Sequence, residues 1–343
     1  MNLIRIRTEK TMTSILAPLL LLPPPGPHRN PLPFNSSLSS LHPLLLPPSS
    51  SSFCKIRSLH TQKKWPVFQA PPTLNLTQDE AGDGEDDFKV LAAIQSFYNH
   101  IVIVETQESR MLLLDYTHNV HSIYRKGQTW TRSYWDEFAS LPAIIPKGPI
   151  AILGLGGGTA ANLMLDLWPS LELEGWEIDQ LLIDKARDYL GLSELEKQTP
   201  KGGILKVNVG DALSSSVNIP GGYAGIVVDL FSNGEILPQL KEEATWLELF
   251  AKLMPNGRIM VNCGAARDGP LEQVSPDTDN TWLLNSTVKA MCKAFPGQVS
   301  WKNMPKENGL NCMALTGPLP DLKTWSSLLP DPLSSSIQQW ASC

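Results

Sequence analysis

Residues 149–159 read Pro-Ile-Ala-Ile-Leu-Gly-Leu-Gly-Gly-Gly-Thr, and residues 176–179 read Trp-Glu-Ile-Asp. The apolar run 150–153 enters a turn with four glycines, and a second run ends on the carboxylate of Glu177. Glycines let a ligand approach the backbone closely, and a carboxylate at the end of the next strand can hold both hydroxyls of a ribose. The stretch therefore predicts a site for a nucleoside-containing cofactor in an α/β fold.

From this turn onward, runs typical of strands alternate with runs typical of helices. Alternation of this kind predicts parallel strands joined by crossover helices, a Rossmann-like, doubly wound sheet. The last two expected strands leave no room for a helix between them and should form an antiparallel hairpin. The expected strands are 150–154, 171–177, 204–209, 225–229, 258–262, 298–302 and 311–316, and the expected helices are 159–168, 179–190, 240–254 and 280–294.

The remaining chain divides by composition. Short β-branched or aliphatic runs separated by polar breaks precede the glycine turn and predict a small antiparallel β domain, followed by a helix over 131–141. The C-terminal tail is rich in Pro and Ser, with Trp325 and Trp340 as expected anchors. The expected organisation is a leader (1–64), a linker (65–88), a small β domain (89–130), a cofactor-binding α/β domain (131–317) and a tail (318–343).

Residues 1–64 hold ten Pro, ten Ser, eight Lys or Arg and one acid, Glu9. A basic, Ser-rich, acid-poor leader is typical of an organellar transit peptide, so we expect a chloroplast protein, with the mitochondrion as the alternative. The apolar run 15–22 is too short to span a membrane and is broken by Pro18. The position of transit-peptide cleavage is not readable.

Without the leader, Lys plus Arg fall from 28 to 20 and Asp plus Glu from 34 to 33, which moves the formal net charge from −6 to −13. So acidic a protein lacks the basic footprint of a nucleic-acid-binding protein. The cysteines are scattered, with no C-x-x-C pair, and predict buried apolar residues or free thiols rather than a metal site or a disulfide framework.

Two cofactor classes share the glycine turn. The dinucleotide fingerprint G-x-G-x-x-G would need a third glycine where Thr159 stands. An S-adenosylmethionine (SAM) fold has the same turn and ribose carboxylate, with further acids at later strand ends, and Asp211 and Asp229 fill those positions. SAM binding is therefore expected, without a metal. The expected cofactor-binding residues are Gly154, Gly156, Gly157, Gly158, Thr159, Glu177, Ile178, Asp211, Ala212 and Asp229.

With these motifs in order, the region 95–264 resembles spermidine synthase and the related polyamine aminopropyltransferases, which share the SAM-methyltransferase fold. The motifs that carry the resemblance are Gln95-Ser96-x-Tyr98, Tyr134-x-x-x-Phe138-x-x-Leu141-Pro142, Gly156-Gly-Gly158, Glu177-Ile-Asp179, Gly210-Asp211-Ala212 and Asp229. The resemblance implies decarboxylated SAM as donor, an amine as acceptor, and a homodimer formed through the β domain.

The chain departs from the family pattern at three places. Thr159 replaces the acid after the glycines, Ser232 replaces the second acid of D-x-x-D, and Tyr-His-Glu becomes Tyr134-Trp135-Asp136. Removing a carboxylate beside the donor's amino-acid tail removes a like-charge repulsion on the order of several kcal/mol against intact SAM. These departures favour a SAM-dependent methyltransferase; an aminopropyltransferase and a non-catalytic nucleoside-binding or scaffold protein are the alternatives.

For catalysis, we expect Asp229 to orient or deprotonate the attacking amine and Tyr134 to shape the acceptor pocket. The acceptor is expected to be a small amine or a protein lysine, with no nucleic-acid or membrane partner. His100, His118 and His121 lie in the expected β domain with no catalytic spacing and are interpreted as structural or surface residues. The sequence leaves open the identity of the acceptor and the roles of residues 265–280 and of the tail.

Overall fold

The computed structural model describes residues 88–115, 117, 119–265, 285–305 and 311–343, and the described residues belong to one compact unit. The expected transit peptide, nearly all of the linker, His118 and most of residues 265–280 lie outside the described residues. In the part of the chain that is described, no helix is long and apolar enough to cross a membrane.

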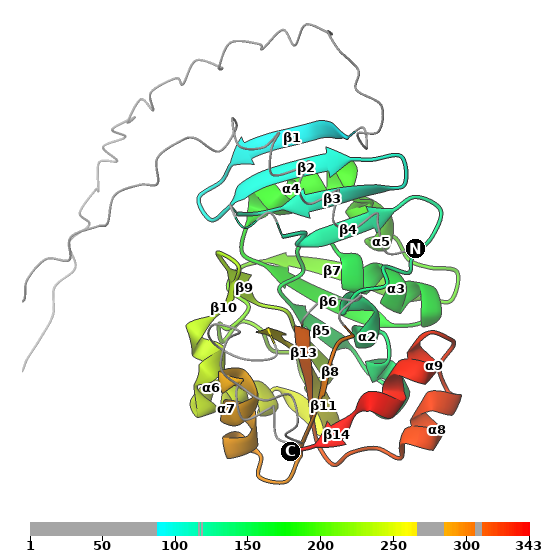
Figure 1. Ribbon diagram of the computed structural model, residues 1–343, viewed down its shortest axis with the longest axis vertical. Coiled ribbons are helices and arrows are strands. Elements are labelled where there is room, and N and C mark those ends of the chain that lie inside the picture. The colour runs from blue at the N-terminus through cyan, green and yellow to red at the C-terminus, as the bar shows by residue number, and fades with distance from the viewer. Residues whose placement is uncertain (1–87, 116, 118, 266–284, 306–310) are drawn as a thin grey trace, which may run out of the picture. The chain divides into compact units, whose positions relative to one another are not determined.

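A four-stranded antiparallel sheet opens the described chain, in the order β1-β2-β3-β4 (Figure 1). Its strands are β1 (Lys89–Gln95), β2 (His100–Glu105), β3 (Ser109–Leu113) and β4 (Ser122–Arg125). The apolar run of β2, an inner strand beside β3, is buried from Ile101 to Val104. The antiparallel sheet expected before the glycine turn is confirmed.

The main sheet has eight strands in the order β14-β12-β13-β11-β8-β5-β6-β7. Five adjacent strands are parallel, and the expected hairpin, β12 with β13, is antiparallel. The predicted α/β fold with an antiparallel end is therefore confirmed. The strands are β5 (Ile150–Leu153), β6 (Glu172–Glu177), β7 (Ile204–Val209), β8 (Tyr223–Val228), β11 (Leu253–Ala265), β12 (Val299–Asn303), β13 (Asn311–Thr316) and β14 (Ala341–Ser342).

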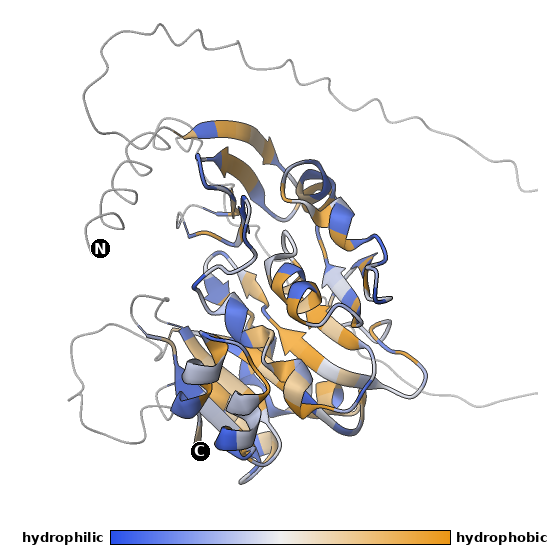
Figure 2. Cartoon of the chain, turned by 90° about the vertical axis from the view of Figure 1, so that its right-hand side faces the viewer, coloured by the Kyte–Doolittle hydropathy of each residue, from blue (hydrophilic) through white to orange (hydrophobic). Residues whose placement is uncertain are grey.

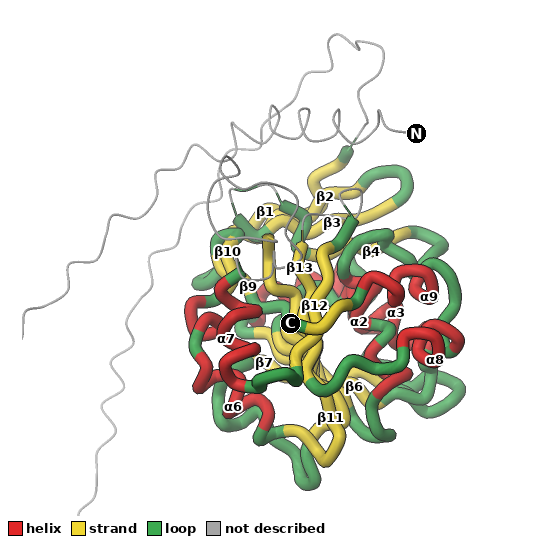
Figure 3. Tube along the Cα trace, turned by 60° about the horizontal axis from the view of Figure 1, so that its bottom comes forward, coloured by secondary structure: helices red, strands yellow, loops and turns green. Residues whose placement is uncertain are grey.

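Helices cover both faces of this sheet, as Figure 3 shows from its lower end. Ile150 and Ile152 of β5 face one buried cluster, and Ala151 and Leu153 face the other, so an unbroken apolar strand is buried on both sides. The apolar colour of the central strands is visible in Figure 2. One face carries α2 (Trp135–Phe138), α3 (Thr159–Leu167), α4 (Gln180–Tyr189) and α5 (Leu192–Leu195); the other carries α6 (Glu243–Phe250) and α7 (Ser286–Ala294).

Three expected helices differ in extent. The helix expected over 280–294 begins only at Ser286, after the N-cap Asn285, and residues 280–284 lie outside the described residues. The helix expected over 131–141 is only α2, four residues long, followed by a 3-10 helix, η1 (Leu141–Ile144). Pro142 lacks the N–H that would continue an α-helix from α2. The helix expected over 240–254 is also too long, because a 3-10 helix, η2 (Pro238–Lys241), precedes α6 and Leu253 already belongs to β11.

The tail folds onto the main unit through α8 (Leu322–Ser327), α9 (Leu333–Ser336), η5 (Ile337–Gln339) and β14. Trp325 and Trp340 are buried, with ring centroids 5.8 Å apart, which confirms them as anchors. The Trp325 indole also donates to the backbone oxygen of Ser140, 3.0 Å away. The tail therefore rests against the segment that contains α2.

Candidate active site

The glycine turn brings the end of β5 against the end of β8. Gly154 has φ of 88°, and a Cβ there would lie 2.2 Å from the backbone oxygen of Asp229. Gly158, the N-cap of α3, has φ of 86°. Only glycine adopts this backbone without strain and allows such an approach. The turn thus places Gly154, directly after β5, against the backbone of Asp229.

Strand β4 lies over the middle of the turn. The Gly157 N–H donates to the hydroxyl of Ser122, 2.7 Å away, and a Cβ on Gly156 would lie 2.8 Å from the same oxygen. From the sequence, the only expected role of these glycines is to let a ligand approach the backbone. The structure shows a second role, since glycine also allows the small sheet to pack closely against the turn.

Thr159 also bonds to strand β4. Its hydroxyl accepts from the N–H of Ile123 at 2.8 Å and donates to the Ile123 backbone oxygen at 3.1 Å. The side chain is 6% exposed. The hydroxyl of Thr159 is thus engaged by β4, and the predicted place of Thr159 among the cofactor-binding residues stays a prediction.

The Glu177 carboxylate is oriented entirely by backbone. It accepts from Gly156 at 3.0 Å, from Ile178 at 3.0 Å and from Asp179 at 3.2 Å. Burial raises the pKa of Glu177, and these three bonds oppose the rise. A carboxylate has about four lone-pair sites, so one acceptor position is left for a ligand hydroxyl at the end of β6.

Asp179 has a different task from its neighbour Glu177. It is the N-cap of α4, accepting from the N–H groups of Leu181 and Leu182. Its other oxygen accepts from Ser96 at 2.5 Å and Asn99 at 2.8 Å. Two of the motifs that carry the family resemblance are thus joined to each other, and Asp179 is buried structure rather than a free ligand group.

Asp211 is exposed after β7 and caps its own turn, accepting from Leu213 N–H at 2.9 Å, while Ala212 beside it is buried. Asp211 also lines a shallow pocket with Gln239, Glu248 and Lys252. Its predicted role in holding the adenine stays a prediction, as does that of Ile178, which is 39% exposed at the end of β6.

Asp229 accepts three hydrogen bonds, all of them from side chains. One oxygen accepts from the Tyr134 hydroxyl at 3.1 Å and the Trp135 indole at 3.2 Å, and the other accepts from the Asn262 amide at 2.9 Å. Burial raises the pKa of Asp229 to about 6 although these bonds lower it. Burial, followed by the Asp229 charge, raises the pKa of Tyr134 well above 10, so Tyr134 is the donor. The structure thus brings together Asp229 and Tyr134, the two residues expected to act in catalysis.

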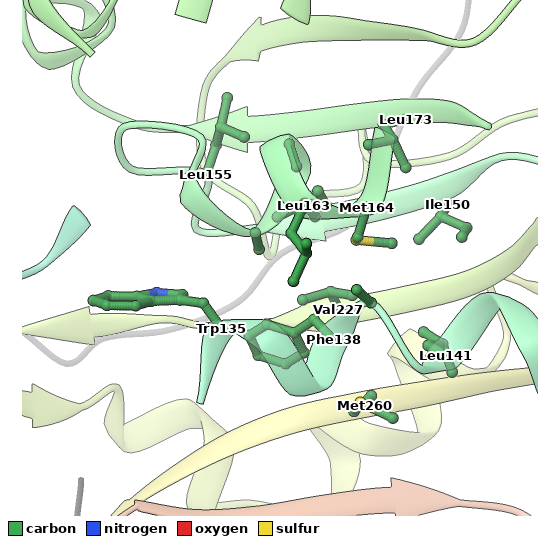
Figure 4. Close-up of a cluster of buried hydrophobic side chains, with 14 of the residues drawn as sticks. Trp135, Phe138, Leu141, Ile150, Leu155, Leu163, Met164, Leu173, Val227 and Met260 are labelled. Atoms are coloured by element: carbon green, nitrogen blue, oxygen red, sulfur yellow. The ribbon is translucent and has the colours of Figure 1, made fainter. Parts of the chain in front are cut away.

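Helix α2 holds two of these donors in place. Tyr134 and Trp135 stand at its start, with ring centroids 4.6 Å apart. Figure 4 shows Trp135 and Phe138 projecting from this short helix, and both belong to the same buried cluster as Leu163. Asp136 accepts three bonds from the Thr131–Arg132 segment and orders the chain before α2, so it is structural.

Three polar partners of this site were not predicted. Asn262 accepts from the Asn311 amide at 2.9 Å and the Gly264 N–H at 3.0 Å, which turns its own amide toward Asp229. The third unpredicted partner, after Asn262 and Asn311, is Trp135. In the sequence it stands out only as part of Tyr134-Trp135-Asp136, where the chain departs from the family pattern. Asn262 ends the apolar run of β11, so the rule that found Asp229 could have found it; nothing marked Asn311.

His121 and Asp115 add a second acid to the site. Their Nε2 and Oδ2 atoms are 3.3 Å apart, and the His121 charge helps to lower the pKa of Asp229. Burial opposes ionisation of Asp115, but bonds from His121 and Thr117 outweigh it and lower its pKa to about 2. His121 is half-buried next to the glycine turn, so its interpretation as a structural or surface residue was incomplete.

In the described segments, no group of three or more His, Cys, Asp or Glu side chains is arranged to hold a metal ion. What the geometry offers instead is a glycine turn at the end of β5, an oriented carboxylate at Glu177, and at Asp229 a carboxyl group whose pKa burial raises to about 6. Such an edge can bind a ribose and poise an amine beside it.

No family model matches the chain. The chain is similar to a probable polyamine aminopropyl transferase of Bifidobacterium longum, with 25% identity over 176 residues, 51% of this chain and 37% of the relative. It thus spans little more than a third of that curated relative. Among solved structures it is similar to a probable spermidine synthase from Corynebacterium glutamicum, at a TM-score of 0.50 and 18% identity, covering 66% of this chain and 79% of the other.

A spermidine synthase from Thermotoga maritima is also similar, at a TM-score of 0.48 and 16% identity, covering 66% of this chain and 72% of that one. The Corynebacterium structure supports the fold, and the Bifidobacterium sequence supports the resemblance over 176 residues. The predicted resemblance to the spermidine synthase-like family is therefore confirmed.

Proposed function

Because the chain resembles spermidine synthase-like proteins in both motifs and fold, we propose that it is a transferase that moves an aminopropyl group from decarboxylated SAM to an amine. The sequence alone ranks methyl transfer first. The curated relative, described as a polyamine aminopropyl transferase, favours the alternative instead.

The observation that carries the proposal is the set of carboxylates around the glycine turn: Glu177, Asp229 and Asp115. Among the described residues that bond these three groups there is no Lys or Arg, and the one imidazole, that of His121, is paired with Asp115. The tail of decarboxylated SAM is an ammonium, whereas the tail of SAM carries a carboxylate. At an effective dielectric near 20, a like-charge pair about 4 Å apart costs about 4 kcal/mol. The site therefore favours the cationic donor and a cationic acceptor.

The chemistry is one displacement. The amine nitrogen forms a bond to the methylene carbon next to the sulfonium, the C–S bond breaks, and a neutral thioether nucleoside leaves. A free amine has a pKa of about 10, above the value of about 6 for Asp229, so the carboxylate first orients the ammonium by charge. An ammonium has no lone pair, so it must lose a proton to Asp229 before the neutral nitrogen attacks the carbon. Tyr134 and Trp135 hold Asp229 in position.

The discriminating experiment is calorimetric titration of the full chain with decarboxylated SAM and with SAM, followed by incubation with putrescine. We expect at least tenfold tighter binding of decarboxylated SAM and formation of spermidine. Glu177→Gln should weaken donor binding by about 2 kcal/mol, as expected for a lost charged hydrogen-bond partner. Glu172→Gln, an exposed glutamate at the other end of β6, is the matched control.

Methyl transfer remains the second candidate because of one observation. The position where the family carries an acid holds Thr159, which is bonded to Ile123 and offers no charge to an ammonium. Tighter binding of SAM, with transfer of a labelled methyl group, would support this candidate over the first. If neither donor bound, and Glu177→Gln gave the same titration as the unaltered chain, the non-catalytic binding or scaffold protein would be the remaining alternative.

We also propose that residues 1–64 direct the protein to the chloroplast, with the mitochondrion as the alternative. The support is the basic, Ser-rich and acid-poor composition of that segment. A fluorescent fusion of the full chain should enter the chloroplast, and a fusion without residues 1–64 should not.

A further inference from the structure

Four cysteines that are far apart in the sequence come together on one side of the main sheet. Cys263 lies on β11 and Cys312 on the neighbouring β13, and each thiol donates to a backbone oxygen of its own strand. Cys292 lies in α7, and Cys343 follows β14. Burial raises the pKa of Cys263, and the neighbouring Cys312, Cys292 and Cys343 raise it further. The four cysteines are therefore far apart in the sequence but close together in the fold.

Cys292 and Cys343 are in direct contact. Their Sγ atoms are 2.6 Å apart. Unbonded carbon atoms are most stable about 3.5–4.0 Å apart, and sulfur is larger than carbon. The two side chains therefore point at each other as closely as a reacting pair requires, and only a small shift separates them from a covalent bond.

Ordered backbone holds both partners. The Cys343 N–H donates to the backbone oxygen of Val299 at 3.0 Å, and the preceding residue, Ser342, pairs with Ser300 of β12. Cys292 is near the end of α7, whose N-cap Asn285 accepts from Val288. The contact thus joins two secondary-structure elements and is not a chance meeting of loops.

Accessibility separates this pair from the other two thiols. Cys292 and Cys343 are half-buried, whereas Cys263 and Cys312 are 3% and 0% exposed. The hydrogen bond between the two thiols lowers the pKa of Cys292 and raises that of Cys343. Thiol–disulfide exchange starts from an accessible thiolate, so Cys292 is the attacking group.

We propose that Cys292 and Cys343 form a redox modification site, a dithiol that exchange with a small or protein disulfide converts into an intramolecular disulfide between α7 and β14. With oxidised glutathione, the Cys292 thiolate attacks one sulfur, forms a mixed disulfide and releases one glutathione thiolate. The Cys343 thiolate then attacks the Cys292 sulfur and releases the second. The two electrons lost by the protein reside on two reduced glutathiones, and the two protons go to solvent or to those thiolates.

The test is to incubate the full chain with oxidised glutathione, alkylate the free thiols and map the peptides by mass spectrometry without reduction. We expect one cross-linked species that joins Cys292 to Cys343. Cys343→Ser should leave a lasting glutathione adduct on Cys292, and Cys54→Ser should leave the cross-link unchanged. Free, alkylated Cys292 and Cys343 after exposure would overturn the proposal, as would a cross-link from either residue to Cys54, Cys263 or Cys312.

A second measurement tests the link without peptide mapping. Because the disulfide closes a loop of about 50 residues, the melting temperature of the oxidised chain should exceed that of the reduced chain by on the order of 5 °C. Cys343→Ser should melt at the same temperature in both conditions. If the unaltered chain had the same melting temperature when oxidised and when reduced, the proposed disulfide would be contradicted. Neither readout depends on donor binding or activity.

Discussion

The ammonium of Lys302 and the carboxylate of Glu137 form an ion pair of 2.9 Å, and their side chains are only 0% and 3% exposed. Lys302 belongs to β12 and Glu137 to α2. Lys302 also donates to the backbone oxygen of Ser336, and the Ser336 hydroxyl bonds to Glu137. The main sheet, the tail and α2 thus meet at one buried point. Glu137 lies within one helical turn of Tyr134 and Trp135, which bond Asp229.

Breaking this ion pair should destabilise the fold. Lys302→Met leaves the Glu137 carboxylate buried without its cation, which costs about 3–5 kcal/mol. Urea unfolding should show that loss, and the double variant Lys302→Met with Glu137→Gln should recover a large part of it, because it leaves no buried charge. A loss under about 1 kcal/mol in the single variant would show that the pair is not held as the structure has it.

The pH dependence of stability should report Asp229. Its folded pKa of about 6 lies above the usual value of 3.8, so the folded state takes up the proton first as pH falls. Asp229 therefore contributes stability that is fully present below about pH 4 and is lost as pH rises through about 6. Relative to Asp229→Asn, the unaltered chain should lose on the order of 2 kcal/mol between pH 4 and 7. Parallel profiles of the two proteins in urea would contradict this.

Activity should change with pH in the opposite direction. If Asp229 takes the proton of the amine, the ionised carboxylate is needed, and kcat/KM should rise with pH through an inflection near 6. The Asp229→Asn variant should lack that inflection. An inflection that persists in the variant would assign the titration to another group.

The neighbour of Asp229 on β11 offers a sharper test of the same group. Asn262→Asp places a second carboxylate 2.9 Å from Asp229, in place of the amide donor. Two carboxylates so close cannot both ionise freely, so the inflection should move upward by more than one pH unit. Asn256→Asp, an exposed position on the same strand with φ of 64°, should leave it unchanged. An unmoved inflection in Asn262→Asp would exclude the contact.

Local pattern was sufficient for the sheet and for part of the site. The strand that ends at Glu177 and the strand that ends before Asp229 follow from apolar runs, and adjacent parallel strands bring such ends to one edge. The need for glycine at position 154 follows as well, although the sequence assigns that glycine to a ligand and the structure shows the backbone of Asp229 against it. These features need only neighbours in sequence and the topology of an α/β sheet.

What could not be predicted depends on contacts between distant segments. The sequence shows Thr159 beside three glycines, but only the fold shows that β4 takes its hydroxyl. Asn311 and His121 reach the site from β13 and from the small sheet. Lys302 looks like an exposed strand residue until the tail covers it with Trp340, 5.7 Å from its ammonium. Each of these depends on how separate segments pack, which spacing does not encode.

The contact of Ser96 with Asp179 should be measurable by a double-mutant cycle. Ser96→Ala and Asp179→Ala each remove one side of a hydrogen bond that joins the β1–β2 turn to the start of α4, and Asp179→Ala also removes the helix cap. We expect a coupling of about 1.5 kcal/mol in urea unfolding, since a bond to a charged group is worth about 1.5–3 kcal/mol. The exposed bond between Thr129 and Asp166, 2.7 Å long, is the matched control and should couple by under about 0.5 kcal/mol. Equal coupling in the two cycles would mean that the small sheet is not bound to α4 through Asp179, and that burial of this aspartate contributes nothing to holding the sheet over the glycine turn.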